Sequence, residues 1–103
     1  MTVLVTGATG FTGGHLARRL KREGYDVRVL ARSTSGAERL RAEGFDVAMG
    51  DLIDAVAVDR AVAGCEFVFH VAALYRTARA SDREFFAVNV EGTRHVLDAA
   101  KRH

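Results

Sequence analysis

The sequence predicts an α/β fold: a doubly wound parallel sheet with four strands in the order 3-2-1-4 and four helices. Short apolar, β-branched runs alternate with segments of helical periodicity, and this alternation is typical of parallel strands joined by right-handed helical crossovers. The strands are almost continuously apolar, as expected when helices cover both faces of a sheet. The order 3-2-1-4 follows if the chain reverses direction after the third strand.

In the first half of the chain we expect three strands and two helices. The strands are expected at 2–6, 26–31 and 45–49, and the helices at 10–23 and 36–43. Leu16, Ala17 and Leu20 form the apolar stripe of the first helix. Each helix is followed by a glycine, Gly24 or Gly44, because glycine readily takes the backbone conformation that ends a helix.

The second half of the chain is expected to add a helix, a strand and a longer helix. They lie at 54–63, at 66–72 and from Ser81 to about Arg102, with a loop at 74–80. Ser81 and Glu84 match the S-x-x-E capping box that begins many helices. The helical period places five side chains on one buried stripe: Phe86, Val90, Thr93, Leu97 and Ala100. Asn89 is expected on the same buried side, with hydrogen-bond partners.

Composition restricts the possible classes of protein. The 103 residues are 49% apolar and 27% charged, with a net charge of +2. We therefore expect one globular domain at residues 1–103 and no nucleic-acid partner. No apolar run is long enough to cross a membrane, and the N-terminus does not resemble a signal peptide. The lone cysteine favours the cytoplasm, and the histidines lack metal-ligand spacing, so no metal site is predicted.

The strongest functional motif is T-G-A-T-G-F-T-G at residues 6–13, directly after the first strand and at the start of the first helix. Gly7 permits a tight turn, Gly10 lets the backbone approach a pyrophosphate, and Gly13 lets the helix lie close to the sheet. The unpaired N–H groups of the first helical turn then face the phosphates. The alternative is that these glycines serve the turn and its packing only. Their position between a strand and a helix favours the phosphate site.

A second candidate site follows the strand at 26–31. In dinucleotide sites an acidic residue there binds the ribose of NAD, whereas an arginine nearby accommodates the 2′-phosphate of NADP. This chain has Arg32 and Ser33 at that point, followed by Ser35 and Arg39. A guanidinium is a planar fork that suits a phosphate. These residues favour NADP over NAD, and the structural alternative is a solvated arginine in a polar loop.

The ends of the third and fourth strands add residues at the same edge. Asp51 is placed to accept a hydrogen bond from an adenine amino group while Leu52 packs on the ring; equally, Asp51 only caps the turn before the next helix. After the fourth strand, Ala72 and Ala73 precede Leu74. Small residues here leave room beside the glycine turn, in the crevice where open α/β sheets bind ligands.

Three other residues have simpler interpretations. His70 lies in an apolar strand and is interpreted as a hydrogen-bonded core residue rather than a catalyst. Cys65 has no basic neighbour in the sequence that would activate its thiol. Asn89 is as well explained by bonds to a neighbouring loop as by a contact with a ligand.

Together these residues resemble the NAD(P)-dependent epimerase/dehydratase family, the extended short-chain dehydrogenase/reductases. The matching segments are T-G-A-T-G-F-T-G at 6–13, G-D-L at 50–52, H-V-A-A at 70–73 and N-V-E-G-T at 89–93. Their order and spacing match as well, over essentially the whole chain. Residues 27–33 and 70–76 are most similar to the branch of dihydroflavonol-reductase-like enzymes and hopanoid-associated sugar epimerases.

The resemblance implies which residues bind the cofactor. By implied role they are Gly7, Thr9, Gly10, Phe11, Thr12 and Gly13 for the pyrophosphate, Arg32 and Ser33 for the 2′-phosphate, Asp51 and Leu52 for adenine, Ala72, Ala73 and Leu74 near the nicotinamide side, and Asn89 near the cofactor. Binding of NADP, or alternatively NAD, is thus the expectation.

The chain departs from the family in one respect. Enzymes of the family abstract a hydroxyl proton with the tyrosine of Y-x-x-x-K, and neither Tyr25 nor Tyr75 has a lysine four residues later. The chain also stops before a fifth strand. The resemblance therefore implies the N-terminal, cofactor-binding half of an oxidoreductase acting on a sugar nucleotide or a related carbonyl or hydroxyl substrate. We expect no catalytic residue and no turnover in this chain alone.

The expected architecture is thus a half-Rossmann dinucleotide-binding fold. The alternatives are a binding or sensor module without chemistry, and a structural unit that binds little. The strand at 66–72 would form an apolar edge with unpaired backbone groups. Such an edge predicts a homodimer, or aggregation, through the fourth strand.

Overall fold

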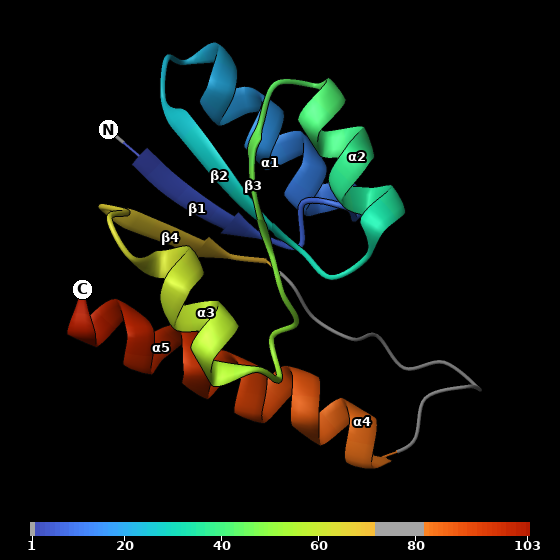
Figure 1. The fold of residues 1–103 in the computed structure, drawn as a ribbon, viewed down its shortest axis with the longest axis vertical. Helices are drawn as coiled ribbons and strands as arrows, with labels where there is room; N and C mark the ends of the chain where they lie inside the picture. Colours follow the sequence, from blue (N-terminus) through green and yellow to red (C-terminus); the bar gives the residue numbers. More distant parts are fainter. Residues whose placement is uncertain (1, 72–81) are drawn as a thin grey trace.

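The centre of the fold is a parallel sheet of four strands (Figure 1). The computed structural model describes residues 2–71 and 82–103. The strands are β1 (Thr2–Thr6), β2 (Asp26–Ala31), β3 (Asp46–Met49) and β4 (Phe67–His70). They lie in the order β3-β2-β1-β4, which confirms the predicted topology.

The register of the strands brings their carboxyl ends to one edge of the sheet. Val5 of β1 pairs with Val29 of β2 on one side and with Phe69 of β4 on the other. At the end of β1, Thr6 pairs with His70. The chain thus leaves β1 toward β2 and β3 and returns to β4 on the opposite side. This reversal forms a crevice beyond the ends of β1 and β4, where open α/β sheets bind ligands.

Helices cover both faces of the sheet. They are α1 (Phe11–Arg22), α2 (Thr34–Ala42), α3 (Ala55–Val62), α4 (Asp82–Phe86), η1 (Ala87–Glu91) and α5 (Gly92–Arg102). α1 and α2 lie on one face, and α3 and α5 lie on the other (Figure 1). α4, η1 and α5 follow one another directly as the predicted last helix, but η1 is a π-helical segment. Among the described residues, no helix is both long and apolar enough to span a membrane.

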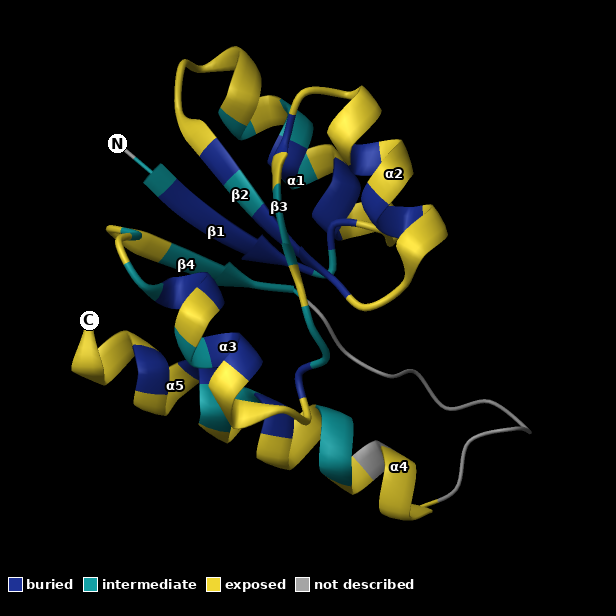
Figure 2. Ribbon diagram, in the orientation of Figure 1, coloured by how far each residue is buried: buried dark blue, intermediate teal, exposed yellow. Residues whose placement is uncertain are grey.

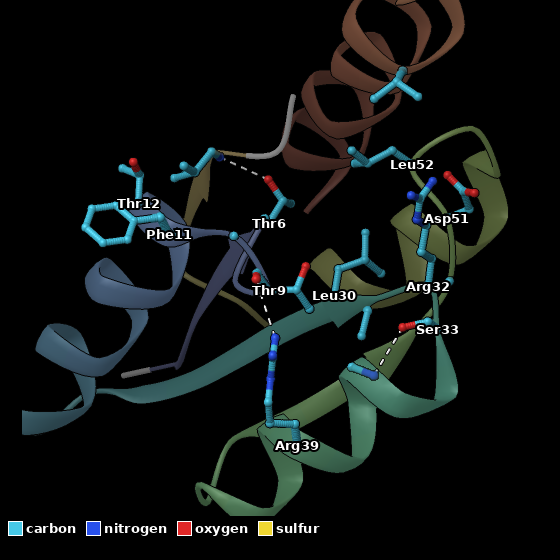
Figure 3. Close-up of a pocket in the computed structure, with 18 of the residues that line it drawn as sticks. Thr6, Thr9, Phe11, Thr12, Leu30, Arg32, Ser33, Arg39, Asp51 and Leu52 are labelled. Atoms are coloured by element: carbon cyan, nitrogen blue, oxygen red, sulfur yellow. Dashed lines mark hydrogen bonds between the residues drawn. The ribbon is translucent and has the colours of Figure 1, made fainter. Parts of the chain in front are cut away.

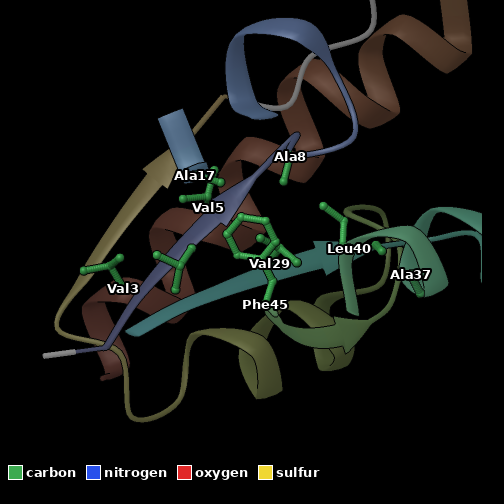
Figure 4. Packing of buried hydrophobic residues seen from close by; sticks show 10 residues of the cluster. Val3, Val5, Ala8, Ala17, Val29, Ala37, Leu40 and Phe45 are labelled. Carbon is green, nitrogen blue, oxygen red and sulfur yellow. The ribbon is translucent and has the colours of Figure 1, made fainter. Parts of the chain in front are cut away.

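Two apolar clusters fill the space between the sheet and its helices. Val3 and Val5 point to the face that α1 and α2 cover, where they belong to one cluster with Leu40 (Figure 4). Leu4 points to the other face and packs with residues of α3 and α5 such as Val58. The alternation arises because successive side chains of a strand point to opposite faces. Burial of each such side chain stabilises the fold by about 1.5–3 kcal/mol. Figure 2 shows β1 and β2 largely buried between helices with exposed outer faces, whereas the edge strands β3 and β4 are intermediate to exposed.

Side-chain caps determine where α2 and α3 begin. The Ser33 hydroxyl accepts a hydrogen bond from the Gly36 N–H at 3.1 Å, so α2 begins at Thr34 rather than at the predicted residue 36. Asp54 Oδ1 accepts from the Val56 and Ala57 N–H groups at 3.1 and 3.3 Å. Because a serine at the N-cap satisfies an otherwise unpaired N–H group, it starts a helix where the sequence had suggested a polar loop.

β4 is shorter than the predicted strand at 66–72. It ends at His70, and the next N–H group, that of Val71, donates to the side-chain oxygen of Thr6 at 3.1 Å. A side chain therefore takes the position that the ladder partner would have. The predicted strand end at Ala72 and the predicted cap at Ser81 lie outside the described residues.

The predicted buried stripe of the last helix is wrong. Four of its members are exposed: Phe86, Val90, Leu97 and Ala100. The buried positions are instead Gly92, Val96 and Ala99. A Cβ atom added to Gly92 would lie 3.0 Å from the Cβ of Leu52, so the helix approaches its neighbours too closely for large side chains. Asn89 is exposed as well, which contradicts its predicted burial.

Candidate functional site

A cavity of about 720 Å³ opens at the carboxyl ends of the strands, within the size range of small-molecule sites. Most of the predicted cofactor-binding residues line it: Gly7, Thr9, Gly10, Phe11, Thr12, Gly13, Arg32, Ser33, Asp51 and Leu52. Figure 3 shows Phe11 and Thr12 at one end of the cavity and Arg32, Ser33 and Asp51 at the other. Three further predicted residues, Ala72, Ala73 and Leu74, lie outside the described residues.

The glycine turn joins β1 to α1 at the floor of the cavity. Gly7 has a φ of 78°, which glycine adopts without strain, and its carbonyl accepts from the Gly10 N–H at 3.0 Å. A Cβ atom on Gly13 would lie 2.1 Å from the Gly7 oxygen, so α1 packs directly on the turn. A Cβ on Gly10 would meet that oxygen only at 3.4 Å. Gly13 is thus required by packing inside the protein, whereas Gly10 is not.

The N-terminus of α1 is suited to an anion. Gly10 occupies the N-cap position and provides no side-chain cap, and the first turn contains no acidic residue. The N–H groups of that turn therefore lack side-chain acceptors, and they carry the positive end of the helix dipole. Phe11 beside them is 83% exposed, and its ring meets that of His15 edge-on with centroids 4.5 Å apart.

Two guanidinium groups line the cavity. Arg32 follows β2 and is exposed. Arg39 of α2 reaches across to the glycine turn, where its Nη2 donates to the Thr9 carbonyl at 3.4 Å (Figure 3). Ser33 and Ser35 line the cavity as well. Since the Ser33 oxygen already accepts a hydrogen bond from the Gly36 N–H, its hydroxyl proton is the group that could donate a hydrogen bond to a ligand.

The turn after β3 forms another wall of the cavity. Asp51 Oδ1 accepts from the Ile53 N–H at 3.3 Å, so the carboxylate does cap its own turn while it lines the cavity. Leu52 is 8% exposed and belongs to the core beneath α3 and α5. His95 of α5 holds this turn, because its Nδ1 lies 2.7 Å from the Leu52 carbonyl. Nothing in the sequence indicates this contact between residues so far apart.

The end of β4 and η1 form a further wall of the cavity. Val71 and Val88 line the cavity there, and Thr6 lies at its floor. Among the described lining residues Val88 takes the place expected for Asn89. The Asn89 carbonyl accepts from the Thr93 hydroxyl at 2.8 Å. A role for Asn89 toward the cofactor therefore stays a prediction.

His70 is hydrogen-bonded, as the sequence suggested, but it is only half-buried. The Nδ1 and Nε2 atoms of His70 lie 2.7 Å from Thr6 Oγ1 and 3.0 Å from Thr93 Oγ1, and burial lowers the pKa of the imidazole. Cys65 has a basic neighbour that the sequence did not indicate, because Arg28 Nη1 lies 3.4 Å from its Sγ. Burial also raises the pKa of the Cys65 thiol, against the opposing effect of the nearby Arg28 charge. Within the described part of the chain, no group of three or more potential metal ligands comes together.

Comparison with known proteins identifies the family. The model of the NAD dependent epimerase/dehydratase family matches residues 3–103. The chain belongs to this family. A ketoreductase for 4-hydroxy-2-methyl-3-oxo-4-farnesyl-3,4-dihydroquinoline-1-oxide from Stigmatella aurantiaca is 41% identical over 98% of this chain and 30% of its own length. A putative dihydroflavonol 4-reductase from Synechocystis is 39% identical over 95% of this chain and 28% of its own. The chain thus spans about 30% of the length of such relatives.

Solved structures of similar proteins contain dinucleotides. A short-chain dehydrogenase/reductase superfamily protein from Agrobacterium tumefaciens with bound NAD is 36% identical, with a TM-score of 0.83 over 99% of this chain and 29% of that one. Yeast methylglyoxal/isovaleraldehyde reductase complexed with NADPH is 26% identical, with a TM-score of 0.82 over 99% and 33%. The predicted family and the Rossmann-like fold are therefore confirmed. The chain therefore has the fold of a family that is described as NAD dependent.

Proposed function

We propose that this chain binds NADP(H) in the cavity, in preference to NAD(H). The observation that carries the proposal is the pair of guanidinium groups, Arg32 and Arg39, among the residues that line the cavity. Of the described lining residues only Asp51 is acidic; it follows β3, and its Oδ1 already accepts the Ile53 N–H. The position after β2 that would bind the ribose of NAD through an acid is Arg32.

The proposed arrangement assigns each end of the cavity to one part of the cofactor. The pyrophosphate lies at the N-terminus of α1, where Gly10 leaves its N–H groups accessible. The adenine lies against Leu52, and the 2′-phosphate meets Arg32. A 2′-phosphate is close to a dianion, and the guanidinium fork suits it through charge-assisted hydrogen bonds. One such bond contributes roughly 1.5–3 kcal/mol, or about 10- to 100-fold in affinity.

Calorimetric titration with NADPH and NADH tests the preference. Wild type is expected to bind NADPH about 10- to 100-fold more tightly than NADH, and Arg32→Asp is expected to lose that ratio. Arg41→Asp is the matched control, because Arg41 lies nearby in the sequence, on α2, but does not line the cavity. Equal affinities in wild type, or an unchanged ratio in Arg32→Asp, would overturn the assignment. Raised salt should narrow the ratio, since Arg32 is exposed.

We also infer that the chain supplies the cofactor site for hydride transfer to or from a carbonyl or hydroxyl carbon of a small molecule, such as a sugar nucleotide. Support comes from the reductase names of similar proteins. NADP(H), when bound, supplies or accepts the hydride. The chain has no Y-x-x-x-K, so its own residues bind the cofactor but do not move a substrate proton. Absorbance assays should show NADPH binding without turnover by these 103 residues, and turnover that depends on Gly10 would contradict this.

A further inference from the structure

A hydrogen-bonded chain of side chains runs behind the cavity, from β1 through β4 to α5. The N–H of Val71 donates to Thr6 Oγ1 at 3.1 Å, and Thr6 Oγ1 lies 2.7 Å from His70 Nδ1. On the other side of the ring, His70 Nε2 lies 3.0 Å from Thr93 Oγ1. The Thr93 hydroxyl in turn donates to the Asn89 carbonyl at 2.8 Å. The imidazole therefore joins three elements that are far apart in the sequence.

The donors and acceptors determine which ring nitrogen carries the proton. Since the Thr93 hydroxyl proton goes to the Asn89 carbonyl, its oxygen must accept, and His70 Nε2 must donate. In the neutral ring Nδ1 is then an acceptor, and the Thr6 hydroxyl donates to it while its oxygen accepts the Val71 N–H.

The network ends at residues that line the cavity. Thr6 and Val71 are both lining residues, and Gly7 of the glycine turn directly follows Thr6. On the far side, Thr93 is bonded to η1, the π segment that contributes Val88 to the same cavity. π segments within α-helices occur frequently at functional sites. His70 itself is not a lining residue, so it acts on a ligand only through these neighbours.

We propose that His70, protonated on Nε2, is a positioning residue of the dinucleotide site, which holds Thr6 and Val71 at a fixed distance from α5. The inference rests on the proposed binding of NADP(H). The network fixes both the spacing between the ends of β1 and β4 and their distance from α5. Loss of the ring therefore loosens the wall of the cavity, and the affinity for the cofactor falls even where the protein still folds.

Three substitutions of His70 separate its two hydrogen bonds. His70→Asn keeps an acceptor near the Nδ1 position and thus the bond to Thr6. His70→Gln keeps a donor near the Nε2 position and thus the bond to Thr93, and His70→Phe keeps neither bond. We expect His70→Phe to raise the Kd for NADPH about 3- to 10-fold, as one or two lost hydrogen bonds predict. We expect His70→Asn and His70→Gln each to recover only part of that loss, because each keeps one of the two bonds that connect Thr6 to Thr93. His103→Phe, at the exposed C-terminus, is the matched control.

The test combines titration of the folded variants with ¹⁵N NMR of the imidazole in wild type. We expect one pyridine-like Nδ1 and one protonated Nε2; a ring protonated on Nδ1 alone would overturn the network. A purely structural role would lower the melting temperature of His70→Phe but leave its Kd for NADPH unchanged, and that result would overturn the proposal. If His70→Phe does not fold, Thr93→Val and Thr93→Ser provide the same comparison, and equal Kd values for the two would be decisive against it. Failure of wild type to bind NADPH would instead refute the proposed function, and the NMR result would still report on the network.

Discussion

Gly10 and Gly13 lie three residues apart on one turn, yet the structure requires a glycine at only one of them. Gly13→Ala would place a Cβ atom 2.1 Å from the Gly7 oxygen. The turn or α1 would have to move, and overpacking of this kind costs about 1–3 kcal/mol or more. Gly10→Ala meets that oxygen at 3.4 Å and should cost less than about 1 kcal/mol. Thermal unfolding followed by circular dichroism measures both.

The branched variant Gly10→Val tests the site rather than the fold. Gly10 has a φ of −87°, which suits any residue, so we expect Gly10→Val to stay folded. Its side chain would occupy the space that a pyrophosphate needs, and NADPH binding should be lost. An unchanged affinity in the folded variant would mean that the glycine turn is a packing device only.

His70 should make the stability of the protein depend on pH near neutrality. Burial lowers the pKa of His70 from its ordinary value of 6.5, so the unfolded chain takes up a proton more readily than the folded one. Stability is therefore fully present above about pH 6.5 and falls as the pH drops toward the folded-state pKa. Uptake of one whole proton on unfolding would change the free energy of unfolding by about 1.4 kcal/mol per pH unit. The slope should be well below that value, because His70 is only half-buried.

Urea unfolding of wild type and His70→Asn between pH 7.5 and 5 measures this dependence. The variant should show a flatter profile over that range. The carboxyls of Glu43 and Asp59 also have lowered pKa values, through hydrogen bonds to Arg18 and Arg102. They lose their contribution only at lower pH, below their ordinary values of 4.5 and 3.8. Parallel profiles in wild type and variant would show that His70 is not the group responsible.

At the scale of elements, Arg28 joins β2 to the end of α3. Its Nη1 donates to the Ala61 and Ala63 carbonyls at 2.9 and 2.7 Å, and its Nε donates to Asp46 Oδ2 at 3.0 Å. Carbonyls at a helix C-terminus lack helical partners and favour a cation. Arg28→Met should therefore destabilise the protein by about 1–3 kcal/mol.

A second arginine provides the control for Arg28→Met. Arg19 makes an exposed ion pair with Glu23 one helical turn away, and such pairs contribute little. Arg19→Met should thus change the free energy of unfolding by less than about 0.5 kcal/mol. Equal losses in the two variants, measured by denaturant unfolding, would show that the carbonyl contacts of Arg28 do not matter.

Helices and strands that depend on the local sequence were predictable, whereas contacts between elements far apart in the sequence were not. β1 and β2 lie at the predicted residues because short β-branched runs and their flanking turns are visible in the sequence itself. The glycine turn lies at the cavity for the same reason. The prediction of the buried side of the last helix failed because it was based on hydrophobicity, which favoured burial of Leu97. In the structure, close packing against α3 and Leu52 favours small residues instead. The contact of His95 with Leu52, 43 residues apart, has no signal in the sequence.

At the scale of the whole molecule, β4 is an edge strand of the four-stranded sheet in the part of the chain that the structure describes. Phe67 on this strand is 57% exposed, and an unblocked apolar edge favours pairing with another chain. We expect these 103 residues to self-associate at high concentration, and Phe67→Lys to weaken that association because it places a charge on the edge. Light scattering of both proteins over a concentration series measures it.

Leu97→Lys shows whether the edge is responsible for such association. Leu97 is 64% exposed and lies on α5 rather than on the edge strand, so its substitution should leave the association unchanged. A monomeric wild type at high concentration would contradict the prediction. Equal effects of Phe67→Lys and Leu97→Lys would assign the contact to exposed apolar side chains in general rather than to the strand.

The π segment Ala87–Glu91 also determines where this molecule tolerates a change in chain length. An α-helix turns by 100° per residue, so a one-residue deletion within a regular helix rotates everything beyond it away from its neighbours. Here the Gly92 N–H bonds to the carbonyl of Ala87, five residues back, and the turn already holds one residue more than an α-helical turn. Deleting a residue within η1 would close that turn as α-helix, and the side chains of α5 would still face α3. The helix beside the cavity thus contains one position at which its length is adjustable.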